Sequence, residues 1–186
     1  MSSREIRRLP NSAPSTKGRT VYGYAAKFNT VSKNLGGSSP WYEEILPGAF
    51  PDLSSQDCRA FFNHDRNHVL ARSKQGRGTL KLSVDRVGLR YEFEAPDTTT
   101  ANDMLESIRR GDIDGASFAF SVLKDDWITR DGKRIRQIQK IARLHDVSIV
   151  TEGAYSEATA AARSAANKSR PITDEVADWK ARFGFN

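Results

Sequence analysis

The stretch GASFAFSVL at residues 115–123 alternates small and bulky side chains, which is the pattern of a β-strand. The bulky face carries Phe118, Phe120 and Val122, and the small face carries Ser117, Ala119 and Ser121. Downstream, Asp131-Gly132 is the two-residue signal of a tight hairpin turn, and residues 141–150 form a further β-prone segment. These features predict a mostly β domain.

Upstream segments extend this prediction. Residues 20–28 (TVYGYAAKF) predict a strand with a bend or bulge, because Gly23 lies inside a β-prone run. Residues 41–46 predict a short strand. Residues 80–93 alternate on both sides of a turn at 85–88, so they predict a hairpin.

Three segments have helical character. The first lies between Thr98 and Gly111, where a threonine at 98, 99 or 100 caps the start and the glycine ends the helix. Residues 158–166 are rich in alanine, and residues 174–182 predict a final short helix. The expected fold class is therefore α+β, mostly β with a few helices.

The length of 186 residues suits one compact domain with tails. Residues 1–18 are rich in Ser, Pro, Arg and Asn without apolar periodicity, so we expect a flexible N-terminal tail that forms no core element. We expect the domain itself over residues 19–164. Residues 165–186 are expected to form a linker and a short C-terminal helix or tail.

Charge and composition limit the partners and the compartment. The formal net charge of +6 and the pI of about 9.6 suit a nucleic acid or an acidic protein, and charge alone does not choose between them. No run approaches the roughly 18 apolar residues of a membrane span, and the N-terminus lacks the apolar centre of a secretory signal. We therefore expect a soluble chain in a cytoplasm. The single cysteine, Cys58, excludes an internal disulfide and is expected to be a buried or incidental thiol.

Acyl transfer at neutral pH needs a nucleophile, a base and a group that orients the base. Only His64, His68 and His145 are available as histidine bases. His64 lies in the turn-prone segment FNHD, and Ser117 has small neighbours that let a substrate backbone approach. Each also has a simpler interpretation when taken alone: His64 as a surface-loop histidine, and Ser117 as an ordinary serine on the exposed face of a sheet.

The orienting group must accept a hydrogen bond from the imidazole. Asp146 and His145 both qualify, and they fall on opposite faces if residues 141–150 form a regular strand. Asp146 is the stronger electrostatic partner for a protonated imidazole, so the chemistry favours it. Asp65 is less suitable because adjacent strand residues point apart.

Six segments together carry a resemblance to a known family. They are GYAAKFNTVS (23–32), YEEILPGAF (42–50), FNHD (62–65), RYEFEAPDT (90–98), GDIDGASFAFSV (111–122) and LHDVSIVTEGAYSEA (144–158). In order and spacing the chain resembles the prohead protease family of tailed phages, whose fold is related to that of assemblin, the herpesvirus capsid-maturation protease. The resemblance covers residues 21–164 and implies an assemblin-like antiparallel β-barrel, closed or partly open, flanked by helices.

The resemblance also implies roles for particular residues. It places the catalytic histidine at His64, the nucleophile at Ser117 and the acidic third member at Asp146, where many relatives have glutamate and assemblins have a second histidine. Herpesvirus enzymes add an arginine pair after the third member, but residues 151–155 here contain no arginine. We expect backbone N–H groups of Gly153 or Ala154 to form the oxyanion hole instead.

The function implied is that of a serine endopeptidase that cleaves scaffolding and capsid proteins, and itself, during phage prohead maturation. The expected location is the host cytoplasm, inside the immature capsid. The expected partners are the major capsid protein, the scaffold and other copies of the chain, as substrates or in a homodimer. We expect no cofactor, no metal and no membrane partner, and nucleic acid is not required.

Two other functions compete with this one. His64 and His68 have the i, i+4 spacing of zinc hydrolases, but Asn63, Asp65 and Asn67 disfavour the helix that such a motif needs. A non-enzymatic basic capsid scaffold or nucleic-acid-binding assembly factor would use the +6 charge instead. That protein would bind DNA with a steep salt dependence and would be indifferent to Ser117→Ala.

Overall fold

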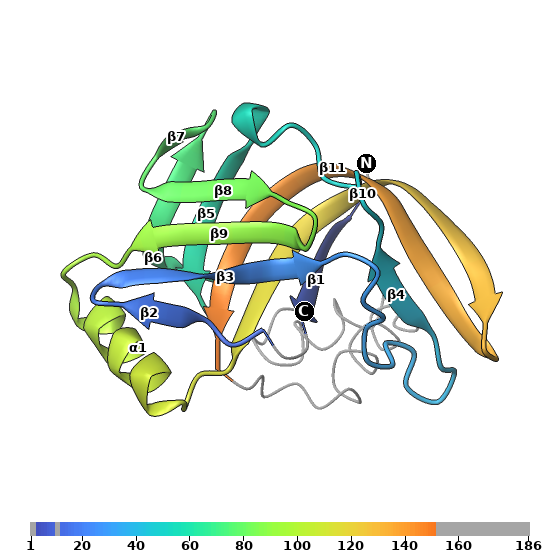
Figure 1. Cartoon of the computed structure of the whole chain (residues 1–186), viewed down its shortest axis with the longest axis horizontal. Helices are drawn as coiled ribbons and strands as arrows, with labels where there is room; N and C mark the ends of the chain where they lie inside the picture. Colours follow the sequence, from blue (N-terminus) through green and yellow to red (C-terminus); the bar gives the residue numbers. More distant parts are fainter. Residues whose placement is uncertain (1–2, 10–11, 152–186) are drawn as a thin grey trace, which may run out of the picture.

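The structure, a computed structural model, describes residues 3–9 and 12–151. These residues form two β-sheets and one α-helix (Figure 1). The strands and helices follow the chain in the order β1 (Arg4–Leu9), β2 (Ser15–Lys17), β3 (Thr20–Lys27), β4 (Tyr42–Ile45), η1 (Leu53–Ser55), β5 (Asp57–Phe62), β6 (Asp65–Lys74), β7 (Arg77–Gly78), β8 (Leu80–Val84), β9 (Gly88–Glu94), α1 (Thr99–Arg110), β10 (Gly115–Arg130) and β11 (Lys133–Val150).

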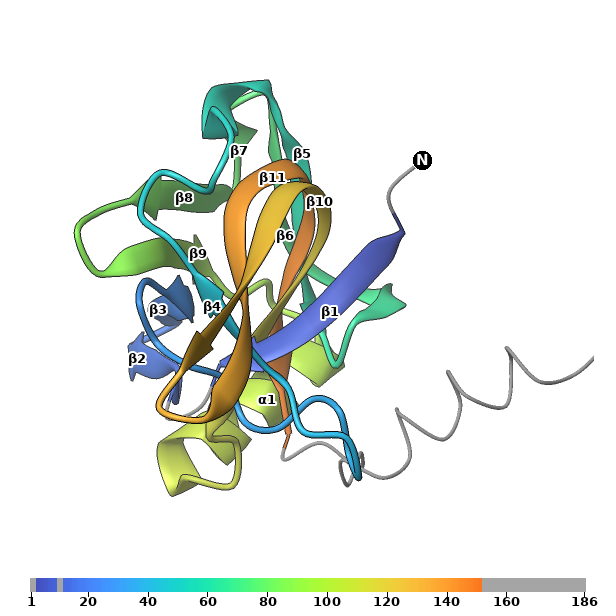
Figure 2. The same cartoon turned by 90° about the vertical axis from the view of Figure 1, so that its right-hand side faces the viewer.

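The larger sheet is built around the long hairpin of β10 and β11. Its strand order is β1-β10-β11-β5-β6-β7, and β4 pairs with the first part of β11. The hairpin turns at Asp131 and Gly132, with φ values of 52° and 71°, which confirms the predicted turn. Figure 2 shows the hairpin as a twisted ribbon that curves across the molecule, with β1 beside β10.

The smaller sheet has the antiparallel order β2-β3-β9-β8. Its β8–β9 hairpin confirms the prediction for residues 80–93. Strand β3 contains the predicted irregularity, although the register shifts between Tyr24 and Ala26 rather than at the glycine. A glycine is needed at position 23 for a different reason, which is close packing. A Cβ there would lie 2.9 Å from the Tyr91 hydroxyl oxygen.

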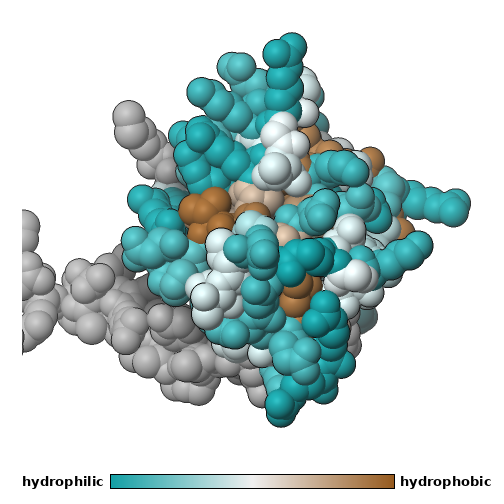
Figure 3. All heavy atoms as spheres, turned by 90° about the vertical axis from the view of Figure 1, so that its left-hand side faces the viewer, coloured by the Kyte–Doolittle hydropathy of each residue, from teal (hydrophilic) through white to brown (hydrophobic). Residues whose placement is uncertain are grey.

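The two sheets pack against each other and share one core (Figure 1). Leu89 and Phe93 enter it from the smaller sheet, and Phe118, Phe120 and Ile149 enter it from the larger one. On the face shown in Figure 3, the surface is mostly hydrophilic, and apolar residues form small separate areas. Burial of apolar surface between the sheets is therefore what holds the larger sheet, and the candidate site on it, in place.

Helix α1 confirms the expected capping. The Thr98 side chain accepts a hydrogen bond from the Ala101 N–H at 3.3 Å, and Gly111 ends the helix with φ of 81°. Met104 and Leu105 are buried on the face that packs onto the core. Among the described residues, no helix is long and apolar enough to cross a membrane.

Three expectations differ from the structure. The expected barrel was closed or partly open and flanked by helices, and the closed form is wrong for the described residues: they form two open sheets and one α-helix, and β1 and β7 end the larger sheet without meeting. The sheets are not wholly antiparallel, since β4 and β5 run parallel to β11. The expected N-terminal tail, residues 1–18, contains two strands, β1 and β2. Strand β1 pairs with β10, more than a hundred residues away, so it leaves no local pattern. Strand β2 pairs with the adjacent β3 across a short turn at residues 18–19 that we did not predict from the sequence.

The remaining helix predictions, at residues 158–166 and 174–182, lie outside the described residues, as does the segment 165–186. The proposed limits of the domain stay a prediction.

Candidate active site

Ser117 lies near the start of β10 and is almost completely buried, with 2% of its surface exposed. Its hydroxyl oxygen lies 2.6 Å from Nε2 of His64 and 2.8 Å from the carbonyl oxygen of Arg7 in β1. Ser117 is therefore not an ordinary serine on an exposed face. Strand β1 pairs along β10 and covers it.

His64 is held by a tight turn between β5 and β6. Asn63 and His64 both have positive φ, 52° and 57°, as a two-residue hairpin turn requires. The Asn63 N–H donates to the Ile149 carbonyl at 2.9 Å, and the Asn63 side-chain oxygen accepts from the Thr151 N–H at 3.0 Å. These bonds fix the turn to the end of β11. His64 is thus a well-anchored residue with 15% of its side chain exposed, not a surface-loop histidine.

Asp146 on β11 is the third member of a hydrogen-bonded series that runs from Ser117 through His64 to Asp146. Its Oδ1 lies 2.6 Å from Nδ1 of His64 and accepts from the Ser148 hydroxyl at 3.0 Å, while its Oδ2 accepts from the Arg4 guanidinium. Burial opposes ionisation of Asp146, but the hydrogen bond and charge of His64, with help from Ser148 and Arg4, outweigh it and lower the carboxyl pKa. Asp146 is therefore ionised at neutral pH.

A β-bulge decides which residue of the pair His145 and Asp146 meets His64. Asp146 lies opposite Ala119, but the next pair is Phe120 with Leu144, so His145 has no opposite residue. Its Nε2 lies 2.8 Å from the Ser121 hydroxyl, on the same face of β10 as Ser117. Residues 141–150 are therefore not a regular strand, and the bulge brings both side chains to one face instead of opposite faces.

The other sequence candidates lie apart from this series. His68 lies on β6, and its Nδ1 is 3.3 Å from the Asp65 carboxylate in an exposed pair. His64 and His68 are on a turn and a strand, so they lack the helical arrangement of the zinc motif. Within residues 3–9 and 12–151, no group of three His, Cys, Asp or Glu side chains gathers as metal ligands do.

Two further candidates do not enter the series. Cys58 is buried, and burial raises the pKa of its thiol far above the ordinary value, so the reactive thiolate is suppressed. Gly153 and Ala154 lie outside the described residues.

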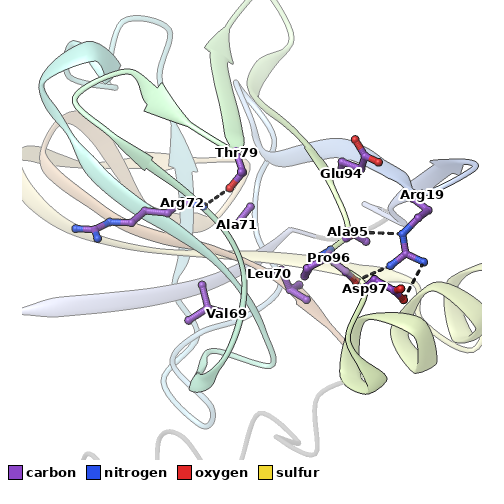
Figure 4. A pocket seen from close by; sticks show the side chains of 10 residues that line it. All are labelled: Arg19, Val69, Leu70, Ala71, Arg72, Thr79, Glu94, Ala95, Pro96 and Asp97. Atoms are coloured by element: carbon purple, nitrogen blue, oxygen red, sulfur yellow. Dashed lines mark hydrogen bonds and ion pairs between the residues drawn. The ribbon is translucent and has the colours of Figure 1, made fainter.

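A hollow on another part of the surface contains none of the three residues (Figure 4). Strand β6 lines one side of it, from Val69 to Arg72, and residues 94–97 line the other. Arg19 closes one end by donating to the carbonyl oxygens of Ala95 at 3.0 Å and Pro96 at 2.5 Å. Thr79 supplies the one hydroxyl side chain among the residues that line this hollow, and no histidine lies beside it as a base. The better candidate site is therefore the one on β10, β11 and the β5–β6 turn.

Sequence reasoning missed Ser148, Arg4 and Arg7. Ser148 lies two residues after Asp146 on one strand, so a search along the same face would have found it. The arginines left no such signal, because β1 reaches the site only through pairing with a strand more than a hundred residues away.

A buried hydroxyl, an imidazole and an ionised carboxylate bonded in series are the arrangement of a serine hydrolase site. Comparison with protein families gives a match over residues 7–171 to the Caudovirus prohead serine proteases. The chain therefore belongs to the Caudovirus prohead serine protease family.

A curated relative, the prohead protease of Enterobacteria phage HK97, is 30% identical over 162 residues. The matched region covers 84% of this chain and 65% of the relative, so this chain matches less than two thirds of that protein's length. No solved structure gives a significant match.

Proposed function

We propose that the chain is a serine endopeptidase in which Ser117 is the nucleophile, His64 is the general base, and Asp146 orients the imidazole and stabilises its protonated form. One observation carries the proposal. Nε2 of His64 lies 2.6 Å from the Ser117 hydroxyl oxygen, and Nδ1 of the same ring lies 2.6 Å from the Asp146 carboxylate. Each distance is within hydrogen-bond reach for proton transfer.

The geometry sets the tautomer. An ionised Asp146 only accepts hydrogen bonds, so Nδ1 of His64 carries the proton and Nε2 presents its lone pair to Ser117. As Ser117 Oγ attacks a peptide carbonyl, its proton passes to Nε2, and Asp146 stabilises the resulting imidazolium. The imidazolium then protonates the leaving amine, and water releases the acyl-enzyme. We keep the backbone N–H groups of Gly153 and Ala154 as the proposed oxyanion hole.

The substrates follow from the family. The match to a protein named a prohead protease supports scaffold and capsid protein, together with the chain itself, as substrates inside an assembling prohead. A homodimer, and a relationship of the fold to assemblin, belong to the same proposal. The chain order His, Ser, Asp differs from the orders of chymotrypsin, subtilisin and the α/β-hydrolases. This is no objection to the proposal, because such triads are defined by geometry and role.

The test compares wild type, Ser117→Ala and Ser121→Ala by intact mass over time, with capsid and scaffold protein present and absent. Ser121 is a buried serine on the same face of β10, and it contacts His145 instead of His64. We expect wild type and Ser121→Ala to release fragments and Ser117→Ala to leave every chain whole. If Ser117→Ala cleaves as wild type does, the assignment is wrong. If no variant cleaves in assembled particles, the non-enzymatic capsid factor becomes the better explanation.

A further inference from the structure

Strand β1 lies in the position where a peptide would have to bind. Residues 4–9 pair antiparallel with residues 116–121 of β10, and Arg8 lies directly opposite Ser117. Figure 2 shows β1 as the outermost strand beside β10. The other edge of β10 is paired with β11, so the edge next to Ser117 accepts only one strand at a time.

The backbone of β1 also contacts the nucleophile. The carbonyl oxygen of Arg7 lies 2.8 Å from the Ser117 hydroxyl oxygen, where an attacked carbonyl group would approach. The hydroxyl has a single proton. It can donate to the Arg7 carbonyl or to Nε2 of His64, so β1 competes with the base for the proton.

Side chains fasten β1 in this position. The Arg7 guanidinium donates to both carboxylate oxygens of Glu43, at 2.7 Å and 3.0 Å, and Glu43 is 3% exposed. The same guanidinium lies 5.9 Å from the ring centroid of Trp41 and 5.8 Å from that of Phe120. At the other end of the strand, Arg4 binds the Asp146 carboxylate.

We propose that residues 4–9 are an autoinhibitory strand that occupies the peptide-binding edge of β10, and that an extended substrate binds this edge in place of β1. The inference rests on the proposed protease function. Strand addition of this kind supplies main-chain hydrogen bonds whatever the sequence of the peptide. Strand β1 ends the larger sheet, so no further strand has to be displaced when it leaves.

The experiment uses the full chain and an irreversible fluorophosphonate probe, which reports whether Ser117 is accessible and activated. Arg7→Ala removes the bonds to Glu43 and touches no side chain of the Ser117–His64–Asp146 series. We expect it to raise the labelling rate about tenfold, because the rate scales with the fraction of molecules in which β1 has left. A synthetic peptide of residues 3–9 (SREIRRL) should slow the labelling of this variant, and a peptide with alanine at the position of Arg7 should not.

Two further variants protect the test. Arg8→Ala is the matched control, since Arg8 lies on the same strand but pairs with the exposed carboxylate of Asp114 at 2.6 Å and should change labelling little. Glu43→Gln weakens the same ion pair by removing the negative charge of Glu43 and leaves Arg7 in place. It should accelerate labelling even if Arg7→Ala folds poorly.

The outcomes separate this inference from the proposed function. Equal labelling rates in wild type, Arg7→Ala and Glu43→Gln would overturn the autoinhibitory role and leave the protease intact. If the folded variants neither label nor cleave scaffold and capsid protein, the protease proposal fails and the inference fails with it. Faster labelling in both variants, slowed by the peptide in Arg7→Ala, where Glu43 is still present, supports the inference.

Discussion

At the scale of single residues, Asp146 is held by three side chains of the site. His64 and Ser148 share its Oδ1, and Arg4 binds its Oδ2. Its side chain is 1% exposed, so these contacts replace the water that an isolated carboxylate would need. The same contacts orient the carboxylate toward Nδ1 of His64, so the residues around Asp146 should affect turnover more than substrate binding.

Ser148→Ala removes one donor from Asp146 without leaving a new charge. We expect kcat to fall about tenfold, because a hydrogen bond to a charged group contributes about 1.5 kcal/mol, and KM to stay close to that of wild type. Steady-state cleavage of a peptide substrate measures both. Ser73→Ala is the control, because Ser73 is also buried. It lies on β6 opposite Cys58 of β5, and β5 separates it from the strand that carries Asp146. A change in KM alone would contradict an orienting role for Ser148.

The lowered pKa of Asp146 makes its contribution to stability depend on pH. The folded pKa lies below the unfolded value of about 3.9, so the ionised group stabilises the fold above that value. This stabilisation is lost as the pH falls through the folded pKa. Urea unfolding of wild type and Asp146→Asn should therefore show a gap in free energy at pH 7 that narrows below about pH 4. A gap that is constant with pH would contradict this account.

At the scale of elements, the β5–β6 turn positions and orients the His64 side chain. The turn has two left-handed residues, which asparagine tolerates better than most residues do. The Asn63 side chain then ties the turn to Thr151 beyond the end of β11. Since the turn carries His64 itself, a small change in its geometry moves Nε2 relative to Ser117.

Asn63→Ala strains the turn and removes the tie to Thr151, whereas Asn63→Gly removes only the tie. We expect both to lower kcat/KM, and only the alanine variant to lose about 1 kcal/mol of additional stability. Thermal unfolding and peptide cleavage measure the two effects. Gly132→Ala is the control at the far tip of the β10–β11 hairpin, where φ is 71° and no atom lies within 4 Å of an added Cβ. It should lose stability and keep its activity.

At the scale of the whole molecule, the site depends on the common core of the two sheets. Phe120 is completely buried and stacks on Phe118 with ring centroids 4.8 Å apart. Both belong to the strand that carries Ser117, and they are part of the same core cluster as Leu89 and Phe93 of the smaller sheet. The sheets should therefore unfold together.

Phe120→Ala is expected to lower the free energy of unfolding by about 3–5 kcal/mol through lost burial and a cavity. Tryptophan fluorescence and far-UV circular dichroism, followed in the same urea titration, should give coincident transitions for wild type. Val84→Ala is the control, because Val84 is 43% exposed. Separate transitions in wild type would show that the sheets are independent units.

Much of the local structure could be predicted from the sequence. The Asp131-Gly132 turn, the Thr98 cap, the Gly111 helix end and the β8–β9 hairpin depend on residues close to one another in the chain, so the sequence determined them directly. The sequence also limited the candidates for a histidine base to three residues. Its residues 7–171 suffice to place the chain in its family.

The tertiary structure decided the details of the site. A single bulged residue, His145, brought Asp146 to His64 and overturned the alternation expected for a regular strand. Strand β1 buried Ser117, although its own residues carried no strand pattern. The physical reason is distance along the chain: Arg7 meets Ser117 across 110 residues, and such a pairing depends on how the whole chain packs, not on any local sequence preference.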